Sequence, residues 1–440
     1  MSNVYLVSLG CDKNRVDGEV MIGTLRNAGY DVVPDPADAT AIIVNTCGFI
    51  RDAVQESIDL VLELVEYKNH GECQALIVVG CMAQRYRTEI EKEIPEADVI
   101  IGVGEYDNIA NVVQNLIGTP KKPITNSQIS RIAARSDDIA PHIAYVKIAE
   151  GCNNHCTYCT IPSIRGAYKS RKIEDILEET RQLTASGAKE IVLVAQDTAL
   201  YGIDIYGEKK LPELLKQLAQ DSNALWIRLM YVYPEHITPE LIDTMANLPQ
   251  VCKYIDMPIQ HSEDEIISKM GRKGSKTALQ KLIKNLRTKM PDITIRTTLI
   301  VGFPGETVET FKNMYRFVST IKFDRLGVFP YSREDGTPAA TMPKQVKENI
   351  KHARLGRIMA LQQQIHFKKQ ELQIGKTLPV IVDSQSETGE YIGRTQGDAY
   401  EVDGVVIFTS KEKLIQGNVV QVKILGSDQY DLRGQYELTQ

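Results

Sequence analysis

The chain lacks the segments that would place it in a membrane or export it. No apolar run approaches the roughly 18 to 20 residues needed to span a bilayer. The first ten residues, MSNVYLVSLG, have no basic region before the apolar one, so they are typical of a strand and not of a signal peptide. Without an export signal the eight cysteines are expected in a reducing compartment, where they bind metal or react more often than they form disulfides. We therefore expect a cytoplasmic protein with no membrane partner.

The composition also lacks an excess of one charge. The formal net charge of −6 gives no sign of a surface that binds nucleic acid in general. The apolar content of 43% and the charged content of 25% are those of a folded globular protein. A chain of 440 residues exceeds one ordinary hydrophobic core, so two or three domains are expected. The sequence shows neither an internal repeat nor a low-complexity tract.

Patterns of strands and helices divide the chain into two α/β domains followed by one β domain. Residues 1–118 alternate short apolar runs with amphipathic segments, which predicts a doubly wound, mainly parallel sheet of the flavodoxin-like kind. A polar stretch, TPKKPITNSQISRIAARSDD, follows as a linker or surface excursion. Residues 138–370 contain six strand candidates with helices between them, which predicts a partial (β/α)6 barrel with its chemistry at the carboxyl ends of the strands. Residues 373–440 show short strands and turn signals, which predict a small antiparallel β-barrel of about five strands.

The stretch GCNNHCTYC contains an incomplete set of metal ligands. Cys152, Cys156 and Cys159 follow a predicted strand, and no fourth cysteine lies nearby. Zinc sites and four-iron clusters usually take four protein ligands. Three thiolates could hold three irons of a cluster and leave the fourth open to a small molecule. A zinc site completed by His155 or a distant residue is the alternative, and it is less favoured because no paired CxxC or HxxxH unit accompanies the three cysteines.

A second group of three cysteines follows strands of the first domain. Cys11, Cys47 and Cys81 come directly after the first, third and fourth predicted strands. The carboxyl ends of parallel strands meet at one edge of the sheet, so the three thiols could form a second cluster site. The alternative is that they are small buried apolar residues, which is common for free cysteine. Cys73 and Cys252 lie outside both groups and are predicted to be structural.

The motif GCNNHCTYCTIP resembles the CxxxCxxC signature of the radical S-adenosylmethionine enzymes. In that superfamily the amino and carboxylate groups of S-adenosylmethionine chelate the fourth iron, and electron transfer cleaves the sulfonium to give a 5′-deoxyadenosyl radical that abstracts hydrogen from carbon. The resemblance thus implies a catalytic role for Cys152, Cys156 and Cys159. The contexts of the other three cysteines, SLGCDKN, NTCGFI and VVGCMAQRY, resemble the N-terminal domain of the methylthiotransferases. With a C-terminal TRAM-type barrel, the resemblance covers essentially the whole chain.

Several stretches resemble the RimO branch of that family, which methylthiolates the β-carbon of an aspartate in small-subunit ribosomal protein twelve. They include SLGCDKNRVDGEVM, CTIPSIRGAYKSR, VAQDTALYGID, WIRLMYVYP and IRTTLIVGFPGET. The tRNA-modifying branch, of which MiaB is an example, typically reads GCQMN and GQNV at two of these places, and a tRNA adenosine methylthiotransferase is the alternative function. The sequence departs from the RimO pattern at Asp12, where proline is common, at Gly18, where serine is, and at HSEDEII.

The resemblance implies a set of cofactors and partners. Two [4Fe-4S] clusters are expected, one on each group of cysteines, together with S-adenosylmethionine used both as methyl donor and as radical source. The N-terminal cluster would supply or carry the inserted sulfur, and both options stay open. Partners would be the ribosomal protein, free or on the ribosome, an electron donor such as flavodoxin or ferredoxin, and a sulfur source. We expect a monomer. A two-cluster electron carrier and a zinc-containing RNA-binding module are the other competitors.

Five residues are further candidates for contact with S-adenosylmethionine. Gln196 and Asp197 end the second barrel strand, at positions that resemble those contacting the methionine moiety in the superfamily. Arg228 lies in the third strand and could pair with a carboxylate. Gly302 and Gly305 could allow the backbone to approach the nucleoside closely. Each also has an ordinary interpretation, as a polar group at a strand end, a surface arginine or a turn glycine.

The charge of the last domain bears on the substrate. From residue 373 onward there are ten acidic and six basic residues, a balance of −4. A domain that binds tRNA should be basic, whereas an acidic one suits a Lys- and Arg-rich ribosomal protein, unless the acids only aid solubility. We expect removal of residues 373–440 to weaken substrate binding but spare cofactor cleavage, and we expect Glu387, Glu390 and Asp398 to be exposed.

Overall fold

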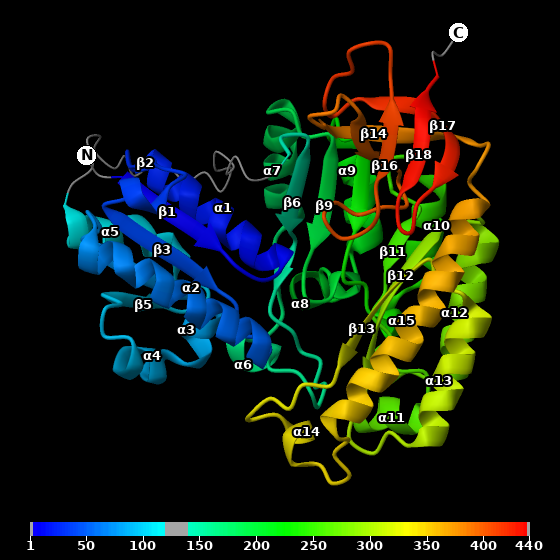
Figure 1. The fold of residues 1–440 in the computed structure, drawn as a ribbon, viewed down its shortest axis with the longest axis horizontal. Helices are drawn as coiled ribbons and strands as arrows, with labels where there is room; N and C mark the ends of the chain where they lie inside the picture. Colours follow the sequence, from blue (N-terminus) through cyan, green and yellow to red (C-terminus); the bar gives the residue numbers. More distant parts are fainter. Residues whose placement is uncertain (1–2, 119–139, 438–440) are drawn as a thin grey trace.

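The computed structural model describes residues 3–118 and 140–437, which form three parts that follow one another along the chain (Figure 1). The predicted polar linker, residues 119–138, lies wholly outside the described residues. Within the described part of the chain, no helix is both long enough and apolar enough to cross a membrane.

The first part is a five-stranded parallel sheet with helices on both faces. Its strand order, β2-β1-β3-β4-β5, is that of the flavodoxin-like folds, which confirms the predicted fold class. The runs AIIVNT and ALIVVG form the central strands β3 and β4 and are buried at every position, because helices cover both faces of a parallel sheet. The strands are β1 (Asn3–Ser8), β2 (Asp31–Val32), β3 (Ala41–Thr46), β4 (Ala75–Gly80) and β5 (Val99–Ile101), and the α-helices are α1 (Asp12–Asn27), α2 (Arg51–His70), α3 (Cys81–Arg85), α4 (Arg87–Glu93) and α5 (Ile109–Ile117).

The second part is a partial barrel of six parallel strands inside a layer of helices. Two three-stranded sheets, β10-β9-β6 and β11-β12-β13, are joined by a bridge between Ile227 and Val251. In β12 buried and half-buried residues alternate, because one face packs on the helices and the other lines the barrel interior. The strands are β6 (Ile143–Lys147), β9 (Glu190–Val194), β10 (Trp226–Leu229), β11 (Tyr254–Asp256), β12 (Thr294–Val301) and β13 (Arg325–Pro330), with a small ribbon of β7 (Ala149–Glu150) and β8 (Lys169–Ser170). The helices are α6 (Ile161–Arg165), α7 (Ile173–Ala185), α8 (Ile203–Tyr206), α9 (Leu211–Asp221), α10 (Pro239–Asn247), α11 (Asp264–Lys269), α12 (Lys276–Lys289), α13 (Val308–Ile321), α14 (Pro338–Thr341) and α15 (Glu348–Glu371).

The third part is a small closed β-barrel with strand order β14-β15-β16-β18-β17. Its strands pair antiparallel, as predicted, except that β16 and β18 pair parallel. The parallel pair arises because β17 lies between β16 and β18 in the chain but not in the barrel. There β17 pairs with β18 on one side and with β14 on the other. The strands are β14 (Thr377–Gln385), β15 (Tyr391–Arg394), β16 (Val406–Thr409), β17 (Val419–Ser427) and β18 (Leu432–Tyr436).

The C-terminal barrel covers the amino-terminal end of the central barrel through buried ion pairs. Glu190, the first residue of β9, accepts from Arg228 at 2.6 Å and from Arg394 of β15 at 2.8 Å. Arg325, the first residue of β13, pairs with Asp398, which is 4% exposed. The structure thus contradicts the expectation that Asp398 is exposed. Removal of residues 373–440 would uncover unpaired charges in the central barrel, so the structure argues against the expectation that such a truncation spares cofactor cleavage.

The N-terminal domain lies along the β6 side of the central barrel and reaches the loops where the barrel strands finish (Figure 1). Arg85, at the end of α3, donates to Glu334 in the loop after β13 at 3.0 Å, and both side chains are at most 10% exposed. The same carboxylate accepts from the backbone N–H of Arg51 at 3.0 Å. The carboxyl ends of the two parallel sheets therefore face one another, which brings the loops that carry chemistry in each domain together.

Candidate active site

The loops that carry Cys11, Cys47 and Cys81 pack directly on one another. Gly10 has φ +92°, and a Cβ built on it would lie 2.9 Å from Sγ of Cys47. A Cβ on Gly48 would lie 2.8 Å from the carbonyl oxygen of Cys81. Both glycines are therefore required by the close approach of the backbone. The structure thus brings together the three thiols that sequence topology placed at one edge of the sheet.

The loop of Cys152, Cys156 and Cys159 follows β7 and is shaped by backbone contacts. Gly151 has φ +74°, and a Cβ there would lie 2.2 Å from the carbonyl oxygen of Ala167. Backbone N–H groups two residues downstream point at two of the sulfurs: Asn154 N–H donates to Cys152 Sγ and Ile161 N–H to Cys159 Sγ, each at 3.4 Å. Donors aimed at sulfur favour its thiolate form and are typical of iron–sulfur ligands.

The third sulfur of this loop contacts a tyrosine from the barrel. The hydroxyl of Tyr233, four residues past β10, lies 2.6 Å from Sγ of Cys156. The guanidinium of Arg272 stacks 3.9 Å from the centroid of the Tyr233 ring and pairs with Glu235 at 2.9 Å. These contacts fix the phenol, so its O–H is a positioned donor to the sulfur once Cys156 is a thiolate.

Burial keeps several of the thiols neutral in the metal-free protein. It raises the pKa of Cys159 to about 12 and that of Cys81 to about 11, and it also raises the pKa of Cys47 and Cys152. A nucleophilic cysteine would need the opposite shift. Buried thiols suit a metal site, because a bound metal cation displaces the thiol protons and neutralises the resulting thiolates.

The described side chains form no site for a single metal ion at either group. Among the described residues, no three His, Cys, Asp or Glu side chains lie close enough together to hold one metal ion. Ligands of one zinc ion would lie roughly 4 Å apart, given Zn–S bonds of about 2.3 Å, whereas thiolates on different irons of a cluster are spaced more widely. His155, the proposed completing ligand of a zinc site, is exposed. The donor set therefore fits a [4Fe-4S] cluster with an open iron at each group of cysteines.

Arg165 connects one thiol of the N-terminal group to the segment that precedes Cys152. It ends α6, directly after the radical-type motif, and its side chain is 1% exposed. One guanidinium nitrogen donates to Asp17 of α1 at 3.1 Å and to Glu150 at 3.0 Å. The other lies 3.3 Å from Sγ of Cys81. A single cation therefore contacts a sulfur of the N-terminal group and a carboxylate two residues before Cys152.

The carboxylate of Glu150 is the centre of a buried polar network. Burial opposes its ionisation, but the Lys147 ammonium and the Arg165 guanidinium outweigh that effect and lower the pKa of Glu150 to about 2. Lys147 also pairs with Asp17 across the domain boundary. The side-chain N–H of Gln196 donates to Glu150 at 2.7 Å. This network holds the N-terminal domain in a fixed position relative to the loop of Cys152.

Gln196 and Asp197, predicted to contact the cofactor, lie beside the loop of Cys152. Asp197 is fully buried and accepts from His236 at 2.6 Å and from Asn154 at 3.2 Å. The Oε1 of Gln196 and the Oδ1 of Asp197 are buried and have no hydrogen-bond partner in the described part of the chain. Buried acceptors without a donor are costly. Two such acceptors beside the loop of Cys152 could accept hydrogen bonds from the ammonium group of a bound amino acid moiety.

The other three candidates are engaged with the protein itself. Arg228 is fully buried, and its guanidinium contacts Glu190 and the carbonyl oxygen of Gln396, at the end of the barrel remote from the thiols. The structure therefore does not bring Arg228 to the site. Arg228 does pair with a carboxylate, but with that of Glu190. Its place in β10 puts its side chain at the interface with the C-terminal barrel.

Gly302 and Gly305 lie in the turn after β12 with φ +73° and +85°, a conformation that favours glycine. A Cβ on Gly302 would lie 2.3 Å from Cγ of Lys351 in α15. A Cβ on Gly305 would lie 3.0 Å from Nζ of Lys269. Contacts within the protein therefore account for both glycines, and contact with a nucleoside remains a prediction.

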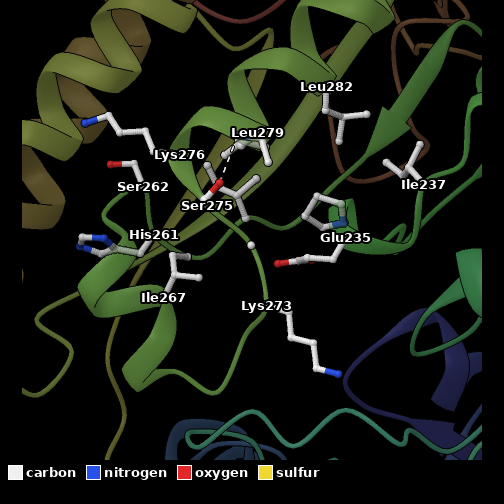
Figure 2. Close-up of a pocket in the computed structure, with 14 residues that line it drawn as sticks. Glu235, Ile237, His261, Ser262, Ile267, Lys273, Ser275, Lys276, Leu279 and Leu282 are labelled. Atoms are coloured by element: carbon white, nitrogen blue, oxygen red, sulfur yellow. Dashed lines mark hydrogen bonds between the residues drawn. The ribbon is translucent and has the colours of Figure 1, made fainter.

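A cavity of about 310 Å³ lies between the segment after β10 and the helices α11 and α12 (Figure 2). Figure 2 shows Glu235 and Ile237 on one side and His261, Ser262 and Ile267 on the other. None of the six cysteines lines it. Glu235, which lines it, pairs with Arg272, and the Arg272 guanidinium lies over the ring of Tyr233.

Sequence patterns did not reveal the polar residues that join the two groups of thiols. Arg165 lies within the motif CTIPSIRG, and Tyr231 and Tyr233 lie within LMYVYP, but none shows a local pattern that predicts its partner. The partners of Arg165 in the N-terminal domain, Cys81 and Asp17, are 84 and 148 residues away in the chain. Their position in the chain could have indicated a role at the site, because each of these residues follows a barrel strand, at the end of the barrel where chemistry is expected.

Models of three protein families match the chain in the order of its three parts. The model described as "Uncharacterized protein family UPF0004" matches residues 3–102, that of the Radical SAM superfamily matches residues 146–318, and that of the TRAM domain matches residues 374–436.

Relatives similar to the chain over nearly its full length carry one name, "Ribosomal protein uS12 methylthiotransferase RimO". The protein from Clostridium kluyveri is 47% identical and that from Clostridium tetani 48%, each over 98% of this chain and 97% of the relative. The protein from Clostridioides difficile is 46% identical over the whole of both chains.

Solved structures share the fold at low sequence identity. The radical S-adenosylmethionine methyltransferase TsrM from Kitasatospora setae, with cobalamin and a [4Fe-4S] cluster bound, matches with a TM-score of 0.57 at 16% identity over 77% of each chain. The cobalamin-dependent enzyme OxsB matches with a TM-score of 0.53 at 11% identity, over 82% of this chain and 56% of that one. These similarities support the fold alone.

Proposed function

Because the chain belongs to the RimO family of radical S-adenosylmethionine methylthiotransferases, we propose that it adds a methylthio group to the β-carbon of an aspartate in ribosomal protein uS12. The observation that supports this proposal most is the placement of two open groups of three thiols on facing strand ends, joined by the single cation of Arg165. An electron carrier would need neither the barrel nor the orphaned acceptors at Gln196 and Asp197.

Six cysteines would hold the metal of this reaction. Cys152, Cys156 and Cys159 would bind the [4Fe-4S] cluster that the superfamily implies, and Cys11, Cys47 and Cys81 would bind a second one. When bound, the first cluster with S-adenosylmethionine on its open iron supplies the electron that cleaves the sulfonium. A second molecule of S-adenosylmethionine would donate the methyl group, and the N-terminal site would provide the sulfur.

The chain's own residues orient and enclose the reactants. The unpartnered oxygens of Gln196 and Asp197 would accept from the ammonium group of S-adenosylmethionine. Tyr233 would donate to the thiolate of Cys156 and so tune its basicity. Docking of the N-terminal domain on the loops of the central barrel would limit the access of water to a reactive radical formed between the two sites.

The remaining partners follow from the reaction. Reductive cleavage requires an external electron donor such as flavodoxin or ferredoxin, and repeated turnover requires a sulfur source. A ribosomal-protein substrate would place the enzyme in the cytoplasm. We propose that it acts there as a monomer. Its domains would comprise residues 1–118, 138–370 and 373–440.

The surface charge of the C-terminal barrel gives weaker support for a protein substrate than the sequence count indicated. Asp383 and Asp398 are buried in ion pairs with Arg394 and Arg325, so they contribute no surface field. Glu387 is exposed, whereas Glu390 pairs with Arg433 at 3.3 Å. The choice of uS12 over tRNA therefore depends on family membership.

A comparison of two substrates in one strain tests the proposed function. Ribosomal-protein peptides and tRNA nucleosides from a deletion strain and from its parent would be analysed by mass spectrometry. We expect one methylthio group to be lost from a uS12 peptide, with the tRNA unchanged. Loss of a methylthioadenosine from tRNA, with uS12 unchanged, would overturn the proposal in favour of a tRNA methylthiotransferase.

A further inference from the structure

The side chain of Lys13 is largely buried, and its ammonium pairs with no carboxylate of the described residues. It is the second residue of α1, it lies two residues after Cys11, and it is 8% exposed. Its ammonium lies 3.1 Å from the centroid of the Tyr231 ring, which is its one recorded contact with a side chain in the described part of the chain. A lysine ammonium can donate three hydrogen bonds, and a buried one is normally paired. A π face compensates for only part of its desolvation, so this group retains capacity for an anion.

The Tyr231 platform under Lys13 is held rigidly. Tyr231 has φ +59°, which is unfavourable for a residue other than glycine. The backbone N–H of Tyr231 donates to the carboxylate of Asp256 at 3.1 Å. The carbonyl oxygen of Tyr231 accepts from the N–H of Thr198 at 3.1 Å. The Tyr231 hydroxyl donates to Asp12 across the domain boundary at 2.9 Å. Backbone strain that several contacts maintain is characteristic of positions that serve function.

Lys13 contacts a residue of the segment that carries Tyr233, while its own helix starts directly after Cys11. Its own helix begins after Cys11, and the ring that it covers comes two residues before Tyr233, whose hydroxyl contacts Cys156. A substrate must reach this space if its carbon is to be activated at one site and to receive sulfur from the other.

The neighbouring cations are already neutralised. Lys147 and Arg165 pair with Asp17 and Glu150, as described above. Arg296, inside the barrel, pairs with Asp256 at 3.1 Å. Of these four cations, Lys13 is the one that a substrate carboxylate can approach without displacing a carboxylate of the described protein.

We propose that Lys13 binds the side-chain carboxylate of the substrate aspartate and so positions the adjacent β-carbon between the two clusters. This inference rests on the proposed function, since that function supplies the carboxylate. It makes Lys13 a determinant of specificity, because an amide or a nucleobase in the same place would leave the buried ammonium without a counter-charge.

Binding measured without turnover tests the inference. The probe is the uS12 peptide that carries the methylthiolated aspartate, paired with the same peptide in which asparagine replaces that residue. Both are titrated by calorimetry against reconstituted protein without reductant. The wild-type protein should bind the aspartate peptide roughly tenfold or more tightly than the asparagine peptide, as expected for a charge-assisted hydrogen bond. Lys13→Met should bind both peptides with the affinity that the wild-type protein has for the asparagine form, and Lys13→Arg should retain a preference for aspartate.

Controls separate this role from structural ones. Lys92→Met removes a lysine of the same domain whose side chain is 80% exposed, and it should keep the full preference. The iron content of Lys13→Met should equal that of the wild-type protein. A tenfold preference that persists in Lys13→Met would overturn the inference, and so would equal weakening of both peptides.

The main competing role is that of a counter-charge for the N-terminal cluster. In that case Lys13→Met would shift the reduction potential of this cluster, measured in the Cys152, Cys156 and Cys159 triple alanine variant, and leave the ratio of the two peptide affinities unchanged. That result would overturn the inference but not the proposed function. Failure of the wild-type protein to bind or modify uS12 would instead overturn the proposed function, and the inference with it.

Discussion

The hydroxyls of Tyr231 and Tyr233 reach toward different groups of thiols although one residue separates them. Tyr231 donates to Asp12, the residue after Cys11, at 2.9 Å, while Tyr233 lies 2.6 Å from Sγ of Cys156. In a regular strand these two side chains would point to the same face. The positive φ of Tyr231 turns the chain, so that one short segment contacts both halves of the site.

Replacing Tyr233 by phenylalanine should lower the reduction potential of the cluster on Cys156. The variant loses the donor to the sulfur, and hydrogen bonds to cluster thiolates raise the potential by stabilising the reduced, more negative state. A redox titration followed by electron paramagnetic resonance would measure the shift in protein that lacks the N-terminal cysteines. Tyr106→Phe is the matched control, because the hydroxyl of Tyr106 is buried without a recorded partner. Equal potentials in wild type and Tyr233→Phe would show that the contact does not act on the cluster.

Alanine at Cys152, Cys156 and Cys159 together should remove one of the two clusters. Anaerobically reconstituted protein should then carry about four irons in place of about eight, and it should form no 5′-deoxyadenosine. Iron and acid-labile sulfide analysis, with chromatography of the nucleoside products, would measure both. Alanine at Cys73, which is buried among apolar side chains, is the control and should keep all the iron. Unchanged iron in the triple variant would refute the assignment of these ligands.

Replacing Arg165 by methionine should destabilise the contact between the N-terminal domain and the central barrel. Asp17 and Glu150 would lose a buried partner, and breaking such a pair typically costs about 3 to 5 kcal/mol. Chemical denaturation of the cluster-free protein would measure the free energy of unfolding. The exposed Arg181→Met should change it little, because surface ion pairs contribute little. The same stability in both variants would mean that Arg165 does not hold the domains together.

The interface with the C-terminal barrel should weaken in acid. Burial opposes ionisation of Glu190, but Arg228 and Arg394 lower its pKa to about 2, below its ordinary value of 4.5. Its contribution to stability is therefore complete above pH 4.5 and is lost as the pH falls from 4.5 toward 2. Thermal melts of cluster-free protein across this range should show a flatter profile for Glu190→Gln than for the wild type, and the exposed Glu240→Gln should keep the wild-type profile. Parallel profiles for Glu190→Gln and the wild type would exclude this role.

The sequence predicts the elements of this fold well where local pattern determines them. Runs such as AIIVNT and ALIVVG are apolar throughout because helices cover both faces, and βα connectivity alone places Cys11, Cys47 and Cys81 at one edge. Contacts between domains have no such pattern. The pairing of Asp398 with Arg325, 73 residues away, makes an acid in a polar loop a buried residue.

Chain position likewise cannot show which carboxylate an arginine meets. The strand position of Arg228 predicts contact with the cofactor, but its guanidinium pairs with Glu190 at the end of the barrel that the C-terminal domain covers. Asp12, a departure from the RimO pattern, accepts the hydrogen bond of Tyr231, which a proline side chain could not do. These relationships depend on how the three domains dock, which no local period encodes.

The central claim is that the two groups of cysteines perform different steps of one reaction. The most direct test is the Cys11, Cys47 and Cys81 triple alanine variant, incubated with reductant, sulfide, S-adenosylmethionine and uS12. One sample would be assayed for 5′-deoxyadenosine and for a methylthio group on uS12. The radical site keeps all its ligands, so cleavage of S-adenosylmethionine should continue while methylthiolation of uS12 disappears. If this variant still methylthiolates uS12, the N-terminal cysteines are only structural and the claim is contradicted.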